Sequence, residues 1–155
     1  MPLGTYEGGR EKAPAAISRK VALASDGDTI EVWGDGLQTR SFMYIDDCVE
    51  GLLRLMASSY HSPLNLGTDR LVTINELVEL ASEIAGKKLH MRHDLSKPQG
   101  VRGRNSDNRR VLEVLGWEPS ISLEKGLATT YAWIESELRK AGRMPKPRTV
   151  GIGAQ

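Results

Sequence analysis

The stretch Gly8-Gly9-Arg10-Glu11-Lys12-Ala13-Pro14 leads into the first predicted element of this 155-residue chain. Its glycine pair permits backbone angles that side chains otherwise forbid, and Pro14 stands where a helix accepts proline in its first turn. Apolar residues then recur at i, i+4 and i+7 from Ile17 to Ala24, which predicts a helix over residues 14–25. Three charged side chains on a glycine-hinged loop at a helix start suit ligand handling better than packing.

A strand follows this helix. Residues 29–33 alternate in polarity, with Ile30 and Val32 on one face, and the glycines of Gly34-Asp35-Gly36 end the pattern. Strands and helices continue to alternate along the chain, which predicts an α/β fold in one domain over residues 1–142, followed by a flexible tail over 143–155. The other expected elements are strands at 41–45, 63–66 and 89–92, and helices with apolar stripes at 49–56, 74–81, 111–115 and 127–138.

Several residues mark where these helices begin and end. Asp46 or Asp47 is expected to cap the helix that carries the stripe from Val49 to Met56. Thr73 and Glu76 have the spacing of a capping box. Glycines at positions 86 and 116 are expected to end the two helices that follow.

The composition excludes several classes of protein. Hydrophobic residues make up 39% of the chain and the mean hydropathy is −0.36, so the chain has enough apolar residues to form a core. No apolar run approaches the roughly 20 residues of a membrane span. The net charge of +1 creates no general attraction to nucleic acid. A single cysteine and the absence of an N-terminal apolar segment favour a reducing, cytoplasmic location without a membrane partner.

Basic residues gather in one region despite the neutral total. Residues 87–110 hold eight Lys or Arg against two Asp, which indicates an anion site. The chain has neither a Walker loop nor a glycine-rich turn between a strand and a helix. Side chains must therefore hold any phosphate, and the candidates are Lys20, Arg40, Arg102 and Arg104.

Other reactive residues carry weaker signals. His90 and His93 would point to opposite faces of a strand, so we expect no metal site. Cys48 has acidic neighbours that oppose thiolate formation, which favours a packed, unreactive thiol. Trp33 could stack on a base or close a pocket, although packing is the commoner role of a tryptophan at a strand end.

The motifs resemble one enzyme family, the GDP-mannose 3,5-epimerases, over most of the chain from Gly4 to about Glu137. The segment Gly8–Pro14 is the most specific part, and Gly100–Asn108 adds to it. The pattern from Trp33 to Asp47 and the later Leu-Gly-Trp-x-Pro motif are shared with many nucleotide-sugar epimerases and dehydratases. The resemblance implies the C-terminal substrate-binding domain of an extended short-chain dehydrogenase/reductase, with late elements of the Rossmann sheet.

The same resemblance implies a chemistry and a set of site residues. Family members use NAD to oxidise C4 of the mannose ring transiently, invert C3 and C5 with an acid/base pair, and return the hydride. By matching motif, Lys12 resembles the lysine of that pair. Glu11, Lys12 and Ala13 would line the sugar site. The GDP diphosphate and ribose would be held by Lys20, Gln38, Thr39, Arg40 and Arg104.

The chain also departs from that family. The glycine-rich NAD turn, the Tyr-x-x-x-Lys pair and the catalytic cysteine lie upstream of the matched region, and Cys48 lies downstream of Lys12. We therefore expect that this chain alone is inactive and binds no NAD, that Met1 need not be the natural start, and that a homodimer is one open assembly. Alternatives are a UDP- or dTDP-sugar epimerase or dehydratase, a small nucleic-acid-binding module over residues 87–110, and a purely structural role.

Overall fold

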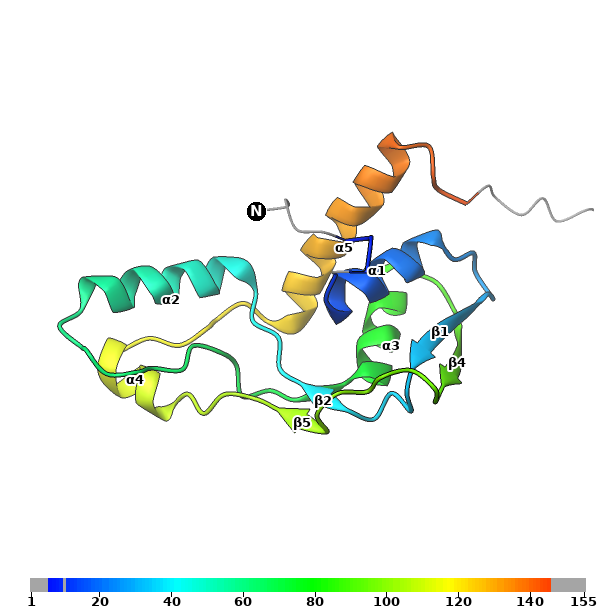
Figure 1. Ribbon diagram of the computed structural model, residues 1–155. Coiled ribbons are helices and arrows are strands. Elements are labelled where there is room, and N and C mark those ends of the chain that lie inside the picture. Colours follow the sequence, from blue (N-terminus) through cyan, green and yellow to red (C-terminus); the bar gives the residue numbers. More distant parts are fainter. Residues whose placement is uncertain (1–5, 10, 146–155) are drawn as a thin grey trace, which may run out of the picture.

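The computed structural model describes residues 6–9 and 11–145 (Figure 1). Three helices pack together: α1 (Ala13–Leu23), α3 (Ile74–Ile84) and α5 (Leu123–Lys140). Beside them lies a parallel pair of strands, β1 (Thr29–Trp33) and β4 (His90–Asp94). Apolar side chains from these helices and from β1 form the main core, with Val21, Leu77, Ile134 and Leu138 fully buried.

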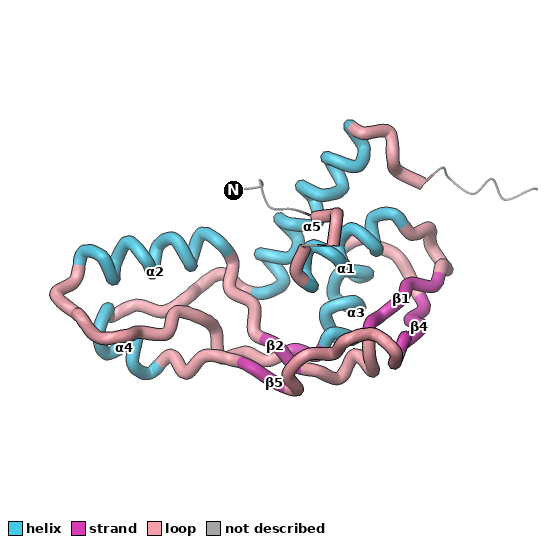
Figure 2. Tube along the Cα trace, in the orientation of Figure 1, coloured by secondary structure: helices cyan, strands magenta, loops and turns pink. Residues whose placement is uncertain are grey.

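A second, very small sheet lies in the middle of the molecule (Figure 2). Its central strand β2 (Thr39–Arg40) pairs antiparallel with β3 (Val72–Thr73) and parallel with β5 (Gly103–Arg104). Each strand has two residues, yet the β2–β5 pairing joins segments 64 positions apart in the sequence. This sheet positions β2, which follows directly from the glycine-containing turn after β1.

Two helices, α2 (Ile45–Ala57) and α4 (Arg109–Leu115), lie at the end of the molecule away from β1 and β4 (Figure 1). The buried Asp47 carboxylate joins α2 to the loop that precedes α5. Its Oδ2 accepts hydrogen bonds from the backbone N–H groups of Ser120 at 3.1 Å and Ile121 at 2.8 Å. Gly51 lets α2 approach the indole of Trp117 closely.

The α/β fold class and most of the expected elements are confirmed. Pro14 lies in the first turn of α1, and the Thr73–Glu76 capping box forms at the start of α3. Gly116 ends α4 with a φ of 58°, in the left-handed region that favours glycine. The strand expected at 89–92 is β4, one residue later than predicted at its start.

Three expectations about local structure were wrong. The strand expected at 41–45 lies at Thr39–Arg40 instead, because Ile45 already begins α2. Residues 63–66 form no strand: among the described residues, β1 pairs with β4 and β2 pairs with β3 and β5, and none of these strands pairs with 63–66. Neither Asp46 nor Asp47 caps α2: its N-cap residue is Tyr44, without a side-chain cap, and Asp47 turns to the backbone of Ser120 and Ile121.

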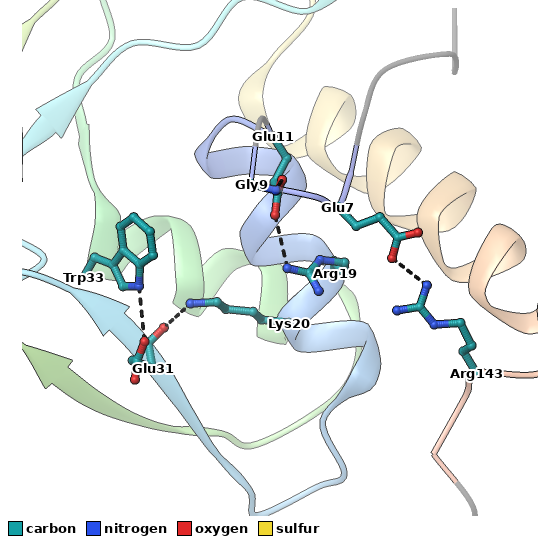
Figure 3. Close-up of polar contacts among 8 residues, drawn as sticks. All are labelled: Glu7, Gly9, Glu11, Arg19, Lys20, Glu31, Trp33 and Arg143. Atoms are coloured by element: carbon teal, nitrogen blue, oxygen red, sulfur yellow. Dashed lines mark hydrogen bonds and ion pairs between the residues drawn. The ribbon is translucent and has the colours of Figure 1, made fainter. Parts of the chain in front are cut away.

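The apolar stripe of α2 is present but uncovered. Ile45, Val49, Leu52, Leu53 and Met56 are between 43% and 81% exposed. No helix within the described residues is long and apolar enough to cross a membrane. The expected tail begins inside the described part: Arg143 forms an ion pair with Glu7 at 2.5 Å, whereas residues 146–155 lie outside it (Figure 3).

Candidate functional site

A cavity of about 480 Å³ lies between α1, β1 and the first turns of α3. Its volume falls within the usual range for small-molecule sites, roughly 300–1,000 Å³. Four of the residues expected to bind substrate line it: Glu11, Ala13, Lys20 and Gln38. The loop around Gly8 and Gly9 lines the cavity on one side, so the charged, glycine-rich segment before α1 borders it.

Glu11 is held tightly at this rim (Figure 3). Its carboxylate accepts hydrogen bonds from the Gly9 backbone N–H at 2.7 Å and from Arg19 at 3.2 Å. Its side chain is only 8% exposed. Its own backbone N–H, the Gly9 N–H and the Arg19 charge lower the pKa of the Glu11 carboxyl. Glu11 is therefore an anion that shapes the glycine loop, and Gly8 and Gly9, with φ of 92° and 83°, permit that loop geometry.

Lys20 points from α1 toward β1. Its Nζ donates a hydrogen bond to the Glu31 carbonyl oxygen at 2.7 Å (Figure 3). Burial lowers the pKa of the Lys20 ammonium, although the nearby Glu31 carboxylate opposes that shift. A partly desolvated ammonium at a cavity wall has donors to spare, since it carries three N–H groups and uses one here.

Gln38 is almost completely buried, with 7% of its surface exposed. Its Nε2 donates to the Trp33 carbonyl oxygen at 3.4 Å, which identifies the amide nitrogen because a carbonyl only accepts. The Oε1 atom is buried and has no hydrogen-bond partner within the described residues. A buried acceptor without a donor costs about 1–3 kcal/mol, so this cavity wall has an unmet need for an N–H or O–H group.

Arg40 and Arg104 are directly opposite each other in the parallel β2–β5 pair, and Thr39 is opposite Gly103. Residues in register on neighbouring strands project to the same face of a sheet. No ion pair between described residues involves either arginine; the Arg40 side chain donates at 2.6 Å to the Thr39 carbonyl oxygen. Two arginines without an ion-pair partner among the described residues thus project from the same face of this small sheet.

The other predicted cations have different placements. Lys12 is exposed at the N-cap of α1 and does not line the cavity, although both of its neighbours do. Arg102, a candidate phosphate ligand, forms an ion pair with Asp35 at 2.8 Å and so braces the turn after β1. Arg10, which precedes Glu11 and Lys12 in the chain, lies outside the described residues.

Sequence reasoning missed part of the cavity wall. Arg19 and Glu31 line it, and neither was a candidate. Their positions in the sequence could have indicated this placement. Arg19 directly precedes Lys20 on α1, and Glu31 lies between the core residues Ile30 and Val32 of β1. Trp33, for which packing was the favoured role, is 51% exposed and lines the cavity.

The described residues offer no resident metal or dinucleotide site. They contain no group of three or more His, Cys, Asp or Glu side chains that could hold a metal ion, and the His93 ring instead contacts the Asn75 amide at 2.9 Å. The turn after β1 runs through Gly34 and Gly36 into another strand rather than a helix. The described residues therefore do not fit the pyrophosphate of NAD.

Comparison with known proteins shows that the chain is similar to nucleotide-sugar enzymes. The family model described as GDP-mannose 4,6 dehydratase matches residues 4–130. GDP-mannose 3,5-epimerase of Arabidopsis thaliana is 51% identical over 139 residues, which cover 90% of this chain and 36% of that protein. UDP-glucuronic acid decarboxylase 1 of Danio rerio is 34% identical over 135 residues, 85% of this chain and 32% of that protein.

Solved structures show the same similarity. The UDP-glucose 4-epimerase of Thermotoga maritima, determined with UDP-glucose, superposes with a TM-score of 0.71 at 30% identity, over 89% of this chain and 42% of that one. The resemblance to GDP-mannose 3,5-epimerases and the fold of the extended short-chain dehydrogenases/reductases are thereby confirmed. The chain spans about a third of the length of the curated relatives that it matches. It belongs to the family described as GDP-mannose 4,6 dehydratase.

Proposed function

We propose that this chain is the substrate-binding part of a GDP-mannose 3,5-epimerase, an isomerase that converts GDP-mannose to GDP-galactose. The identity of about half of all matched residues to named GDP-mannose 3,5-epimerases supports this substrate class. The UDP-sugar enzymes among the relatives are less similar, at 34–38% identity. A UDP-sugar enzyme is therefore the second candidate.

The observation that carries the proposal is the pairing of Arg40 with Arg104 across β2 and β5. Like charges directly opposite each other destabilise a sheet, and such a pair persists at little cost when an anion bridges it. A diphosphate presents several oxygens with the geometry that guanidinium forks match. We place the GDP diphosphate there, with Lys20 and Thr39 close by and the ribose toward Gln38.

The sugar would then lie toward the loop of Glu11, Lys12 and Ala13. Lys12 is the proposed acid: its ammonium can donate a proton to a ring carbon and regain one from solvent, to which it is exposed. Glu11 is engaged with Gly9 and Arg19 and acts as a positioning residue for the loop.

In this proposal, the described residues do not supply the cofactor site. NAD is the expected cofactor of a complete enzyme, and two neighbouring structures are described as complexes with NADPH or NAD. Since the described residues do not fit NAD, we expect no turnover by this chain alone. A cytoplasmic location and a homodimer stay predictions.

A nucleic-acid-binding role has less support. Half of the basic residues in 87–110 are compensated within the structure, because ion pairs join Arg92 to Glu31, Arg102 to Asp35, Arg109 to Asp107 and Arg110 to Glu113. These pairs reduce the free positive surface that a phosphate backbone needs.

Two experiments test the proposal. Isothermal titration of the purified chain should give saturable binding of GDP-mannose and weaker binding of UDP-glucose; equal affinities would favour the second candidate. For Lys12, this chain would replace the matching region of the Arabidopsis thaliana enzyme in a chimaera. Lys12→Ala and Lys12→Arg should both abolish epimerisation while GDP-mannose affinity changes little, because an acid acts mainly in the transition state. Near-normal turnover of the Lys12→Arg chimaera would reduce Lys12 to a positioning charge.

A further inference from the structure

We propose that Arg143, which follows α5, is a positioning residue for the sugar end of the site. Through Glu7 it holds the segment Tyr6–Gly9, which we call the glycine loop, beside the cavity. This inference rests on the proposed function, because that function places the sugar next to this loop. Arg143 was not among the candidate residues, and its effect is exerted on the loop and not on the ligand.

Two contacts join the glycine loop to the other end of the chain. The Arg143 Nη1 donates to the Glu7 carboxylate at 2.5 Å, across 136 positions of the sequence (Figure 3). One residue earlier, the Tyr6 ring meets the ring of Trp133 on α5 edge-on, with centroids 5.4 Å apart and planes at 87°. Neighbouring loop residues are thus attached by one ionic and one aromatic contact, and both partners lie on α5 or just after it.

The loop depends on such contacts, because its glycines lack packing of their own. Gly8 and Gly9 are exposed, and apart from their chain neighbours no described residue comes within 4 Å of where a Cβ would stand at either position. Glycine also loses more conformational freedom on ordering than any other residue. The position of the loop is therefore set at its two ends, by the contacts with α5 and the segment after it, and by the bond from the Gly9 N–H to Glu11.

A shift of the glycine loop would reach only one part of the site. The two glycines and Glu11 line the cavity, and Lys12 follows Glu11 at the start of α1. The two arginines proposed to hold the diphosphate, Arg40 and Arg104, lie on β2 and β5 instead. Loss of the Arg143–Glu7 pair should therefore weaken the hold on the sugar and leave the hold on the diphosphate unchanged.

Titration calorimetry of the full chain with GDP-mannose and with GDP tests this separation. Arg143→Gln should weaken GDP-mannose binding by about 1.5- to 5-fold, the range expected when one exposed ion pair is lost, and should leave GDP affinity unchanged. Arg143→Lys keeps the charge and should keep most of the affinity. Arg139→Gln is the matched control, because it removes an equal charge from an ion pair with Glu135 that lies within α5.

Charge reversal and salt identify the ion pair as the cause. Glu7→Arg alone should weaken GDP-mannose binding, and the addition of Arg143→Glu should restore it, because the reversed pair can form again. Both side chains are 43% exposed, so salt at about 1 M, where the Debye length is about 3 Å, should screen the pair. The difference in GDP-mannose affinity between the unmodified chain and Arg143→Gln should then disappear.

Hydrogen exchange reports the position of the loop directly. The Gly9 amide should exchange faster in Arg143→Gln than in the unmodified chain or in Arg139→Gln, because its bond to Glu11 then lies in a loop released at its other end. The inference is overturned if Arg143→Gln binds GDP-mannose as tightly as the unmodified chain, weakens GDP and GDP-mannose equally, or leaves Gly9 exchange unchanged. In each of these cases the unmodified chain still binds GDP-mannose and the proposed function stands. If the unmodified chain binds no GDP-mannose, both ideas fail.

Discussion

Replacing Arg104 with alanine should move stability and ligand affinity in opposite directions. Arg104 is an exposed residue that faces Arg40 across β2 and β5, and neither side chain has a carboxylate partner within the described residues. The empty protein therefore tolerates a like-charge pair that the ligand would neutralise. A residue kept for packing would show the reverse, since its loss would weaken both properties.

The two magnitudes follow from different terms. An unfavourable cross-strand pair is worth about 0.2–1 kcal/mol, and the exposure of Arg104 places the relief near the low end of that range. One charge-assisted hydrogen bond to phosphate is worth about 1.5–3 kcal/mol, which corresponds to about 10- to 150-fold in affinity. Arg104→Ala should hence unfold at the same or slightly higher urea concentration, yet bind GDP at least tenfold more weakly.

The assay pairs urea unfolding with calorimetric titration of GDP for the unmodified chain, Arg40→Ala, Arg104→Ala and the double variant. Arg139→Ala is the control, because it removes an equal charge from the last turn of α5. The double variant should lose less affinity than the sum of the single losses, since both guanidinium groups bind one diphosphate. Normal GDP binding by both single variants would refute the placement of the diphosphate, and a parallel loss of stability would refute the like-charge argument.

Two further predictions concern the frame around the site. Glu11→Gln should destabilise the chain at pH 7, because the folded-state pKa of Glu11 is lowered. The stability that the ionised Glu11 contributes is present above the ordinary pKa of 4.5 and is lost as pH falls through the folded-state pKa. The urea midpoints of variant and parent should therefore converge in acid. Gly51→Ala would bring a Cβ within 2.7 Å of the Trp117 ring. The cost of overpacking, about 1–3 kcal/mol, should outweigh the gain in helix propensity of up to about 1 kcal/mol, so the variant should be less stable. An unchanged urea midpoint would contradict this prediction.

Local signals predicted the helices well, because the residues that decide a helix lie within a few positions of one another. The capping box of α3 needs only Thr73 and Glu76, and both of its hydrogen bonds form. The early turn of α1 needs only the φ angle of Pro14, which the proline ring itself restricts. Such features survive into the fold because no distant partner has to be guessed.

The strands and the site depend on partners that the sequence does not reveal. Arg40 and Arg104 were both candidates, but their register comes from a two-residue pairing across 64 positions, which periodicity cannot detect. The buried state of Gln38 likewise depends on its bond to the Trp33 carbonyl. The sequence allowed two roles for Trp33, packing in the core or contact with a ligand. Its exposure at the cavity wall is what distinguishes the two roles.

The apolar face of α2 shows this limit most clearly. The spacing from Val49 to Met56 predicts the helix correctly, yet the stripe lies in the open and leaves about 1.5–3 kcal/mol unrealised for each large side chain that could be buried. Amphipathicity is a property of one helix, whereas burial is a property of two surfaces. The stripe therefore indicates which face of α2 would pack against another surface, and it carries no information about what that surface is.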